Sequence, residues 1–169
     1  MKSLIIYPRN KADEMFEIPE GVETVNQLLF EGCQNLREVK LPSTLTTLSM
    51  AMFGSSSIEK VNLNYVEKLS SGTFSRCKNI KVLVLPENIK EIGSQEFYDC
   101  SIEALVIENP DLITEQETFM QAETLTIFLN YDGITDKERG WMPYVAGVYE
   151  RSSWEYVNGV PTLIGEAAA

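Results

Sequence analysis

Apolar side chains recur along this chain at intervals of 21 to 23 residues. The interval is clearest for phenylalanine, which occurs at Phe30, Phe53, Phe74, Phe97 and Phe119. An aliphatic residue precedes the first four of them by five positions, and another follows all five after five or six positions. Alternating aliphatic pairs, such as Val39 with Leu41, then complete the first four units. Because these columns agree over four or five units, the pattern indicates a structural repeat.

Each unit predicts two short elements. The alternating pairs favour a strand of three to five residues, because successive side chains of a strand point to opposite faces. Pro42 and Pro86 close two of these strands, since proline lacks an amide donor. The small residues around each Phe, as in 49–54, favour a single helical or 3₁₀ turn. One unit cannot bury its apolar stripe alone, so we predict stacked coils with parallel strands and a ladder of Phe rings inside.

These elements define a domain organisation. We predict a solenoid over residues 1–130, with an irregular first coil at 4–19 followed by five Phe-anchored repeats. Residues 131–169 fit no repeat and are predicted to form a tail that caps the stack or docks elsewhere. The strand of the fifth repeat, within 125–129, allows two registers, and a shift of one residue would exchange its two faces.

The tail predicts a β-hairpin. Asn158-Gly159 favours a type I′ turn, with Trp154 and Tyr156 on one arm and Val160 on the other. An isolated hairpin is marginally stable in water, so it must pack against another surface. Three placements remain open: the C-terminal end of the stack, the outer face of the strands, or another chain.

The outward positions of the predicted strands change character halfway along the stack. They are Glu38, Lys40, Lys60 and Asn62 in the early units and Val82, Val84, Ala104 and Val106 in the later ones. We predict that the four apolar residues form an exposed patch that binds a protein partner, because contiguous apolar surface marks contact sites. The aromatic residues Trp154 and Tyr156 are the second choice for this role. The alternative is that the chain's own tail covers the patch.

Composition narrows the chemistry. The chain has 25 Asp plus Glu against 14 Lys plus Arg and a net charge of −11, so we predict neither a nucleic acid nor an anionic membrane as partner. The absence of histidine excludes histidine-based catalysis and histidine-ligated zinc. No stretch approaches the roughly 18 apolar residues of a membrane span, so no membrane insertion is predicted. Nothing singles out two carboxylates for glycoside hydrolysis, and we predict no catalytic residue.

The three cysteines share one column of the repeat, three residues after their Phe. Cys33 and Cys77 are two coils apart, too far for a disulfide, whereas Cys77 and Cys100 lie in adjacent coils. Other units place Ser56 and Ala122 in this column, so we interpret the cysteines as buried free thiols. The oxygen-bearing residues around Gly133 miss the EF-hand spacing, so we predict no metal and no cofactor; they are Asn130, Asp132, Asp136 and Glu138.

Two segments carry a resemblance to a known family. They are Phe30-Glu-Gly-Cys33-Gln-Asn-Leu36-Arg-Glu-Val39-Lys-Leu41-Pro42 and Phe74-Ser-Arg-Cys77-Lys-Asn-Ile80-Lys-Val-Leu83-Val-Leu85-Pro86. Both resemble the repeat of BspA-like leucine-rich repeat proteins, over roughly residues 4–130. The resemblance implies a secreted or bacterial cell-surface binding module, often one part of a longer adhesin. The chain itself shows no export signal, because its early apolar run, 4–7, is too short.

The expected fold is therefore a β-rich α/β, right-handed leucine-rich repeat solenoid with one short strand and one short turn per coil, plus a C-terminal β-hairpin cap. The expected function is a non-catalytic protein–protein interaction or adhesion module that uses the sheet face, with self-association left open. The alternative is a structural assembly subunit or spacer whose aromatic tail docks to another chain. An enzyme that acts on carbohydrate through carboxylates is the third hypothesis.

Overall fold

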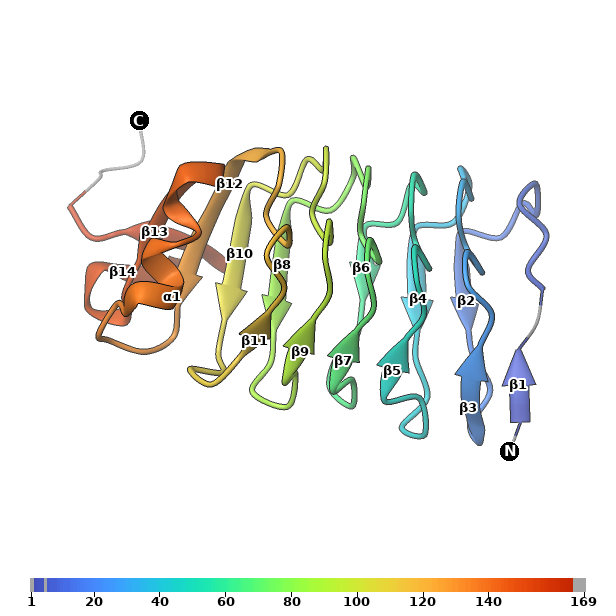
Figure 1. Cartoon of the computed structure of the whole chain (residues 1–169). Coiled ribbons are helices and arrows are strands. Elements are labelled where there is room, and N and C mark those ends of the chain that lie inside the picture. The colour runs from blue at the N-terminus through green and yellow to red at the C-terminus, as the bar shows by residue number, and fades with distance from the viewer. Residues whose placement is uncertain (1, 5, 166–169) are drawn as a thin grey trace.

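The coils lie side by side in chain order from the N-terminus to the C-terminus (Figure 1). The computed structural model describes residues 2–4 and 6–165, so Ile5 of the predicted first coil and the last four residues of the predicted tail lie outside it. The β-rich solenoid and the terminal hairpin expected from the sequence are both present.

The strands predicted from the repeats lie on one side of the stack, in a sheet that we call the first sheet. Its strands are β2 (Met15–Glu17), β4 (Glu38–Lys40), β6 (Lys60–Val61), β8 (Val82–Leu85), β10 (Ala104–Ile107), β12 (Ala122–Leu129) and β13 (Val145–Tyr149). β2, in the predicted irregular coil, and β13, in the predicted tail, are strands that the sequence pattern does not predict. All pair in parallel, in two ladders that run β2-β4-β6 and β8-β10-β12-β13. Parallel pairing follows because each strand is one turn of the same coil.

A second strand in each coil lies on the other side of the stack. These strands form the second sheet and consist of β5 (Thr47–Leu48), β7 (Lys68–Leu69), β9 (Glu91–Ile92) and β11 (Ile113–Thr114). At the N-terminal end, β3 (Val22–Val25) pairs with β1 (Lys2–Leu4). The aliphatic column five residues before each Phe supplies the buried residue of most of these strands, including Leu48, Leu69 and Ile92. The repeat pattern contains this column, but two-residue strands leave no alternation to detect.

A ladder of aromatic rings fills the interior of the stack. The rings of Phe30 and Phe53 are 5.6 Å apart and nearly parallel, as are those of Phe53 and Phe74 and those of Phe97 and Phe119. Tyr7 lies edge-on against Phe30 at the N-terminal end. Parallel rings separated in this way are favourable stacking partners, so the phenylalanine column holds neighbouring coils in register.

Each turn around a Phe contains a residue in the left-handed region. Two residues after the phenylalanine, φ lies between 48° and 69° in five successive coils, at Gly32, Ser55, Arg76, Asp99 and Gln121. Hydrogen bonds between residues three apart, such as Cys77 N–H to the Phe74 carbonyl, close these turns. Left-handed backbone is unfavourable for residues with a Cβ, and glycine occupies this column only once.

We expect Ser55→Gly to raise the free energy of unfolding by about 0.5–1 kcal/mol, because it removes the Cβ from a left-handed position. The matched change is Gly32→Ala, which should lower it by about 1 kcal/mol. A Cβ at Gly32 would meet no atom closer than 3.9 Å, so that loss would report backbone strain and not a clash. Urea unfolding of both variants tests this, and effects of the same sign would contradict it.

The register of the fifth repeat is set by β12. Leu105 pairs with Ile127 and Ile107 with Leu129, so Ile127 and Leu129 continue the inward columns. Phe128 consequently faces outward, in the column that holds Val106. In this register both faces of β12 bury apolar side chains: Ile127 belongs to the main core, and Phe128 belongs to a second, smaller cluster.

The residues after the fifth repeat add one more turn to the stack. The ring of Trp141 lies 5.0 Å from that of Phe119 and covers the end of the aromatic ladder. A short helix, α1 (Asp136–Arg139), precedes it, and two 3₁₀ segments, 142–144 and 151–153, flank β13. The hairpin of β14 (Trp154–Val157) and β15 (Val160–Leu163) follows. Asn158 and Gly159 both have positive φ, as the predicted turn requires.

The turn before α1 is organised by a buried carboxylate. Glu138 accepts hydrogen bonds from the Tyr131 hydroxyl and the Thr135 N–H, both at 3.0 Å. Burial acts to raise the pKa of Glu138, but hydrogen bonds from Thr135, the backbone and Lys137 outweigh it and hold the pKa at about 2. Glu138 is therefore ionised, and its carboxylate oxygens accept hydrogen bonds from residues of the same turn. These hydrogen bonds fix the position at which the final coil begins.

Candidate protein-binding face

The outer face of the first sheet is divided into a covered part and an open part. Ala104 and Val106 of β10 and Phe128 of β12 point outward but are buried, whereas along β2, β4, β6 and β8 the outward positions remain accessible. We call this accessible part the open sheet face; its residues are Met15, Glu17, Glu38, Lys40, Lys60, Asn62, Val82 and Val84. Alternation along each strand places them outward while the Phe ladder lies inside.

The covered part lies under the terminal hairpin. Trp154 is fully buried against Ala104, Val106 and Phe128. Its indole N–H donates to the Leu129 carbonyl at 2.9 Å. A buried ring whose polar group is satisfied in this way makes a specific anchor. Of the three placements left open by the sequence, the hairpin takes the outer face of the strands, while Trp141 closes the end of the aromatic ladder.

The prediction that Val82, Val84, Ala104 and Val106 form an exposed apolar patch is wrong for two of the four residues. Ala104 is 7% exposed and Val106 is 0% exposed, because the hairpin covers them. Trp154, the second-choice anchor, is also buried within its own chain. Val84 remains 36% exposed, Val82 is half-buried beside the hairpin cluster, and Tyr156 is exposed. The structure therefore keeps Val82, Val84 and Tyr156 available; whether any of the six predicted residues binds a partner stays a prediction.

Two adjoining hollows follow the open sheet face. One, of about 440 Å³, is lined by residues of β2, β4 and β6, including Glu38 and Lys40. The other, of about 390 Å³, extends to β8 and includes Val84. Both contain Lys60, Val61 and Asn62, so they form one shallow groove that runs across the strands. Such a groove suits a partner that lies across several coils.

Asn62 shapes the middle of this groove. Its side-chain amide donates to the Leu41 carbonyl at 3.2 Å, and its side-chain oxygen accepts from the Leu41 N–H at 2.6 Å. The side chain thus continues the pairing of β4 with β6 where the backbone of the short β6 stops. It is held close to the sheet, which leaves Lys40 and Lys60 as the long polar side chains that flank it.

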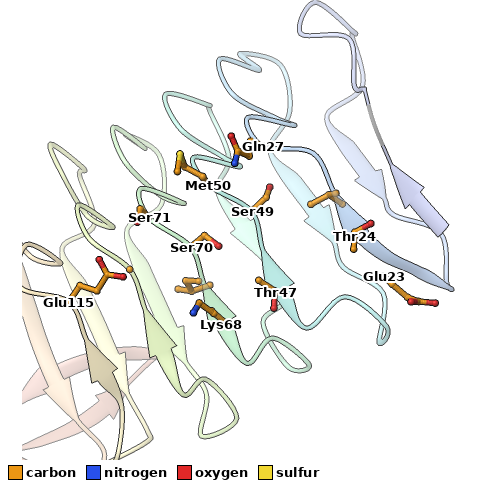
Figure 2. Close-up of a pocket in the computed structure, with 13 residues that line it drawn as sticks. Glu23, Thr24, Gln27, Thr47, Ser49, Met50, Lys68, Ser70, Ser71 and Glu115 are labelled. Atoms are coloured by element: carbon orange, nitrogen blue, oxygen red, sulfur yellow. The ribbon is translucent and has the colours of Figure 1, made fainter. Parts of the chain in front are cut away.

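A separate hollow lies on the other side of the stack, along the second sheet. It measures about 490 Å³ and runs along β3, β5 and β7 (Figure 2). Thr47, Ser49 and Ser70 contribute hydroxyl groups to it, together with the exposed Met50. Its cation, Lys68, lies 2.5 Å from a carboxylate oxygen of Glu91, and this hydrogen bond raises the pKa of Lys68. This hollow therefore presents hydroxyl groups, one exposed ion pair and the Met50 side chain.

The three cysteines of the repeat column lie in the interior of the coils. Cys33, Cys77 and Cys100 are buried free thiols in the structure, as predicted. Burial raises the pKa of the Cys77 thiol to about 12, so it remains protonated and unreactive at neutral pH. Within residues 2–4 and 6–165 no group of three Cys, Asp or Glu side chains is placed to hold a metal ion.

The oxygen-bearing residues around Gly133 have internal partners. Asp132 accepts from the Ser152 N–H at 2.8 Å, and Glu138 is held by Tyr131 and Thr135.

None of the helices in the described part of the chain has the length and apolar character that crossing a bilayer requires.

A stack of short coils with two parallel sheets and an open strand face defines a repeat solenoid. The chain belongs to the BspA type leucine-rich repeat family, whose model matches residues 9–126 in six copies. None of the curated proteins gives a match, and the family indicates no enzyme class.

Solved bacterial structures share this fold. A leucine-rich cell surface protein from Faecalibacterium prausnitzii is 22% identical with a TM-score of 0.64; the match covers 85% of this chain and 38% of that one. A leucine-rich repeat protein from Eubacterium ventriosum is 18% identical with a TM-score of 0.63, covering 89% and 36%. The pneumococcal vaccine antigen PcpA is 17% identical with a TM-score of 0.61, covering 92% and 44%. The chain therefore spans less than half the length of each of these proteins.

Proposed function

We propose that this protein is a non-catalytic module that binds another protein through the open sheet face. The observation that carries the proposal is the groove across β2 to β8, which combines charged and aliphatic side chains. A shallow surface of this composition matches the mixed character of protein interfaces. The proposed contact residues are Val82, Val84 and Tyr156 from the predicted set, joined by Lys40 and Lys60.

The relatives support a role outside the cell. The Faecalibacterium protein is described as a cell surface protein and the pneumococcal one as a vaccine antigen. Adhesion through the open sheet face is consistent with both descriptions. The assembly alternative loses its main anchor, because Trp154 is used within its own chain. Ala104, Val106 and Trp154 are then residues that hold the hairpin beside the groove and do not touch the partner.

We expect Val84→Glu to weaken partner binding at least tenfold, because it puts a charge on the apolar end of the groove. The melting temperature should change by no more than about 2 °C, since exposed positions contribute little to stability. Binding is measured against a panel of purified bacterial and host extracellular proteins by biolayer interferometry.

The matched control is Ile113→Glu, which adds the same charge at an exposed position on β11 of the second sheet. Equal binding by both variants would place the interface elsewhere. If Val84→Glu instead converts an oligomer of the free protein into a monomer, the bound protein is a second copy of this chain.

A further inference from the structure

The first sheet ends at β13, the last strand at the C-terminal end of the stack (Figure 1). β13 pairs with β12 along one edge, and no described strand pairs with its other edge, which we call the open edge. The terminal hairpin lies over the outer face, against Ala104, Val106 and Phe128, and forms a separate sheet. Unpaired N–H and C=O groups along a sheet edge can pair with a strand of another chain.

The sequence of β13 lacks the features that usually prevent such pairing. Its five residues, Val145–Tyr149, include no charged residue and no proline. Charged side chains and prolines are common on edge strands because they block the addition of another strand. β13 therefore presents an uncharged edge, and Ala146 near its middle is exposed.

The end of the second sheet differs, because the last coil covers it. The Lys137 ammonium donates to the Pro110 carbonyl at 2.7 Å and to the Leu112 carbonyl at 3.4 Å, beside β11. The Trp141 indole N–H donates to the Thr114 hydroxyl of β11 at 3.3 Å. The fold thus covers one terminal strand and leaves the other, β13, available for pairing.

The strand register shows which groups of β13 are directed to the open edge. The Thr126 N–H donates to the Glu103 carbonyl beside β10, so the backbone groups of Thr126 point toward β10. Those of Ile127, the next residue, point the opposite way, toward β13. Ile127 lies opposite Val148. In a parallel pair the opposite residue bonds through its two neighbours, so Val148 itself, and Ala146 two residues earlier, direct their N–H and C=O groups to the open edge.

We propose that the open edge of β13 binds the open edge of a second copy of this chain, in an antiparallel pair about a two-fold axis at Gly147. Ala146 of each copy lies opposite Val148 of the other, so these residues exchange backbone hydrogen bonds. Gly147 lies opposite itself, where the lack of side chains permits close approach. Val145 lies opposite Tyr149, an aliphatic–aromatic pair of the kind that stabilises sheets. A two-fold pair uses the same surface on both copies, so assembly stops at the dimer.

The strand is complementary to itself in this arrangement. An axis at Gly147 gives the one antiparallel register that pairs all five residues of β13, and it brings no two charges of the strand together. Each copy carries a net charge of −11, so two copies repel one another at a distance. Salt screens this repulsion and leaves the pairing of uncharged strands intact, so the dimer should strengthen as the salt concentration rises.

The test is sedimentation equilibrium of the full chain over a range of protein and salt concentrations, with hydrogen exchange measured by NMR at both ends of the protein range. A dimer is expected, favoured by salt. The amides of Ala146 and Val148 should exchange at least roughly tenfold more slowly at the high protein concentration, because the pairing engages them.

Substitutions at Ala146 test the edge directly. Ala146→Pro removes one N–H from the open edge and should weaken the dimer by at least roughly tenfold. The preceding residue, Val145, has φ −131° and ψ 161°, the extended conformation that a residue before proline adopts, so the fold should tolerate the change. Ala146→Lys should have the same effect through its charge and does not depend on the backbone accepting a proline. Its matched control is Ile113→Lys, which places a lysine at an exposed position of β11 and should leave the dimer unchanged.

A chain that stays monomeric at high salt and high protein concentration would overturn the proposal, as would assemblies larger than two copies. So would a dimer whose exchange at Ala146 and Val148 does not depend on protein concentration, or one that Ile113→Lys weakens as much as Ala146→Lys. A dimer that is abolished by Val84→Glu and not by Ala146→Lys would place self-association on the open sheet face instead. Binding of a different protein at the open sheet face is measured separately, so the proposed function stands or fails independently of this result.

Discussion

Replacing Trp154 with alanine is expected to release β14 and β15 from the sheet and to speed amide hydrogen exchange across 154–163 by roughly a hundredfold. The reason is that Trp154 is the fully buried anchor of the small cluster beneath the hairpin. Truncating a buried Trp costs about 3–5 kcal/mol, more than a two-stranded hairpin supplies alone. The loss is limited to the docking free energy of the hairpin, because the released segment leaves the coils intact.

The control for this experiment is Tyr156→Ala, two residues further along the same arm. Tyr156 packs edge-on against the Trp154 ring at 5.2 Å but is 49% exposed, so its loss should cost about 1 kcal/mol or less. Amides of the strands β4 to β8 should keep their protection in both variants, since the Phe ladder is unaltered. Equal exchange rates at 154–163 in the two variants would show that Trp154 does not hold the hairpin.

Replacing Glu96 with threonine is expected to make the protein increasingly more stable than the unmodified chain as pH rises from 4.5. Glu96 precedes Phe97 in the interior and is fully buried. One carboxylate oxygen accepts from the Thr73 N–H at 3.0 Å, while the other has no hydrogen-bond partner among the described residues. Burial raises the pKa of Glu96 well above its ordinary value of 4.5, so the folded state holds a proton that the unfolded chain releases.

The direction of the pH effect follows from this difference. The stabilising proton is present in both states below pH 4.5, and its contribution is lost as pH rises from there through the raised pKa of the folded state. Over that window the unmodified chain loses about 1.4 kcal/mol per pH unit relative to a variant without the carboxyl. Threonine suits the site because Thr73 and Thr118 occupy the same column and donate to carbonyls three residues earlier.

Urea unfolding at pH 5, 6 and 7 measures the difference in free energy between the Glu96→Thr variant and the unmodified chain. Glu123→Gln is the control, because it replaces an exposed carboxyl and leaves the buried Glu96 carboxyl in place. Glu96→Gln should also abolish the pH dependence but gain less stability, since its amide hydrogens would lack an acceptor. A difference between Glu96→Thr and the unmodified chain that stays constant with pH would contradict the assignment of a protonated carboxyl.

The repeat itself was predictable because every coil must bury the same apolar columns against its neighbours. A column of Phe, and columns such as Val39, Val61, Leu83 and Leu105, must face inward in each coil for any coil to be stable. Local turn chemistry was sufficient in the same way for the hairpin at Asn158-Gly159. The second sheet was not predicted, because strands as short as Thr47–Leu48 show no alternation of their own.

The candidate site was predicted only in part, for a reason that its residues make clear. Alternation placed Val82, Val84, Ala104 and Val106 on the outward side, but could not reveal that Trp154 covers the last two. Lys40 and Lys60 were placed outward as well, but the groove that they line with Asn62 depends on how side chains of neighbouring coils are arranged.

Sequence alone determined the period, the inward columns and the family, because these depend on contacts that the repeat makes identical from coil to coil. Tertiary structure decided the position of the hairpin and the extent of the open sheet face. Both depend on pairs of residues that no repeat relates, such as Trp154 with Val106. Their contact is specified by packing in three dimensions and leaves no periodic trace along the chain.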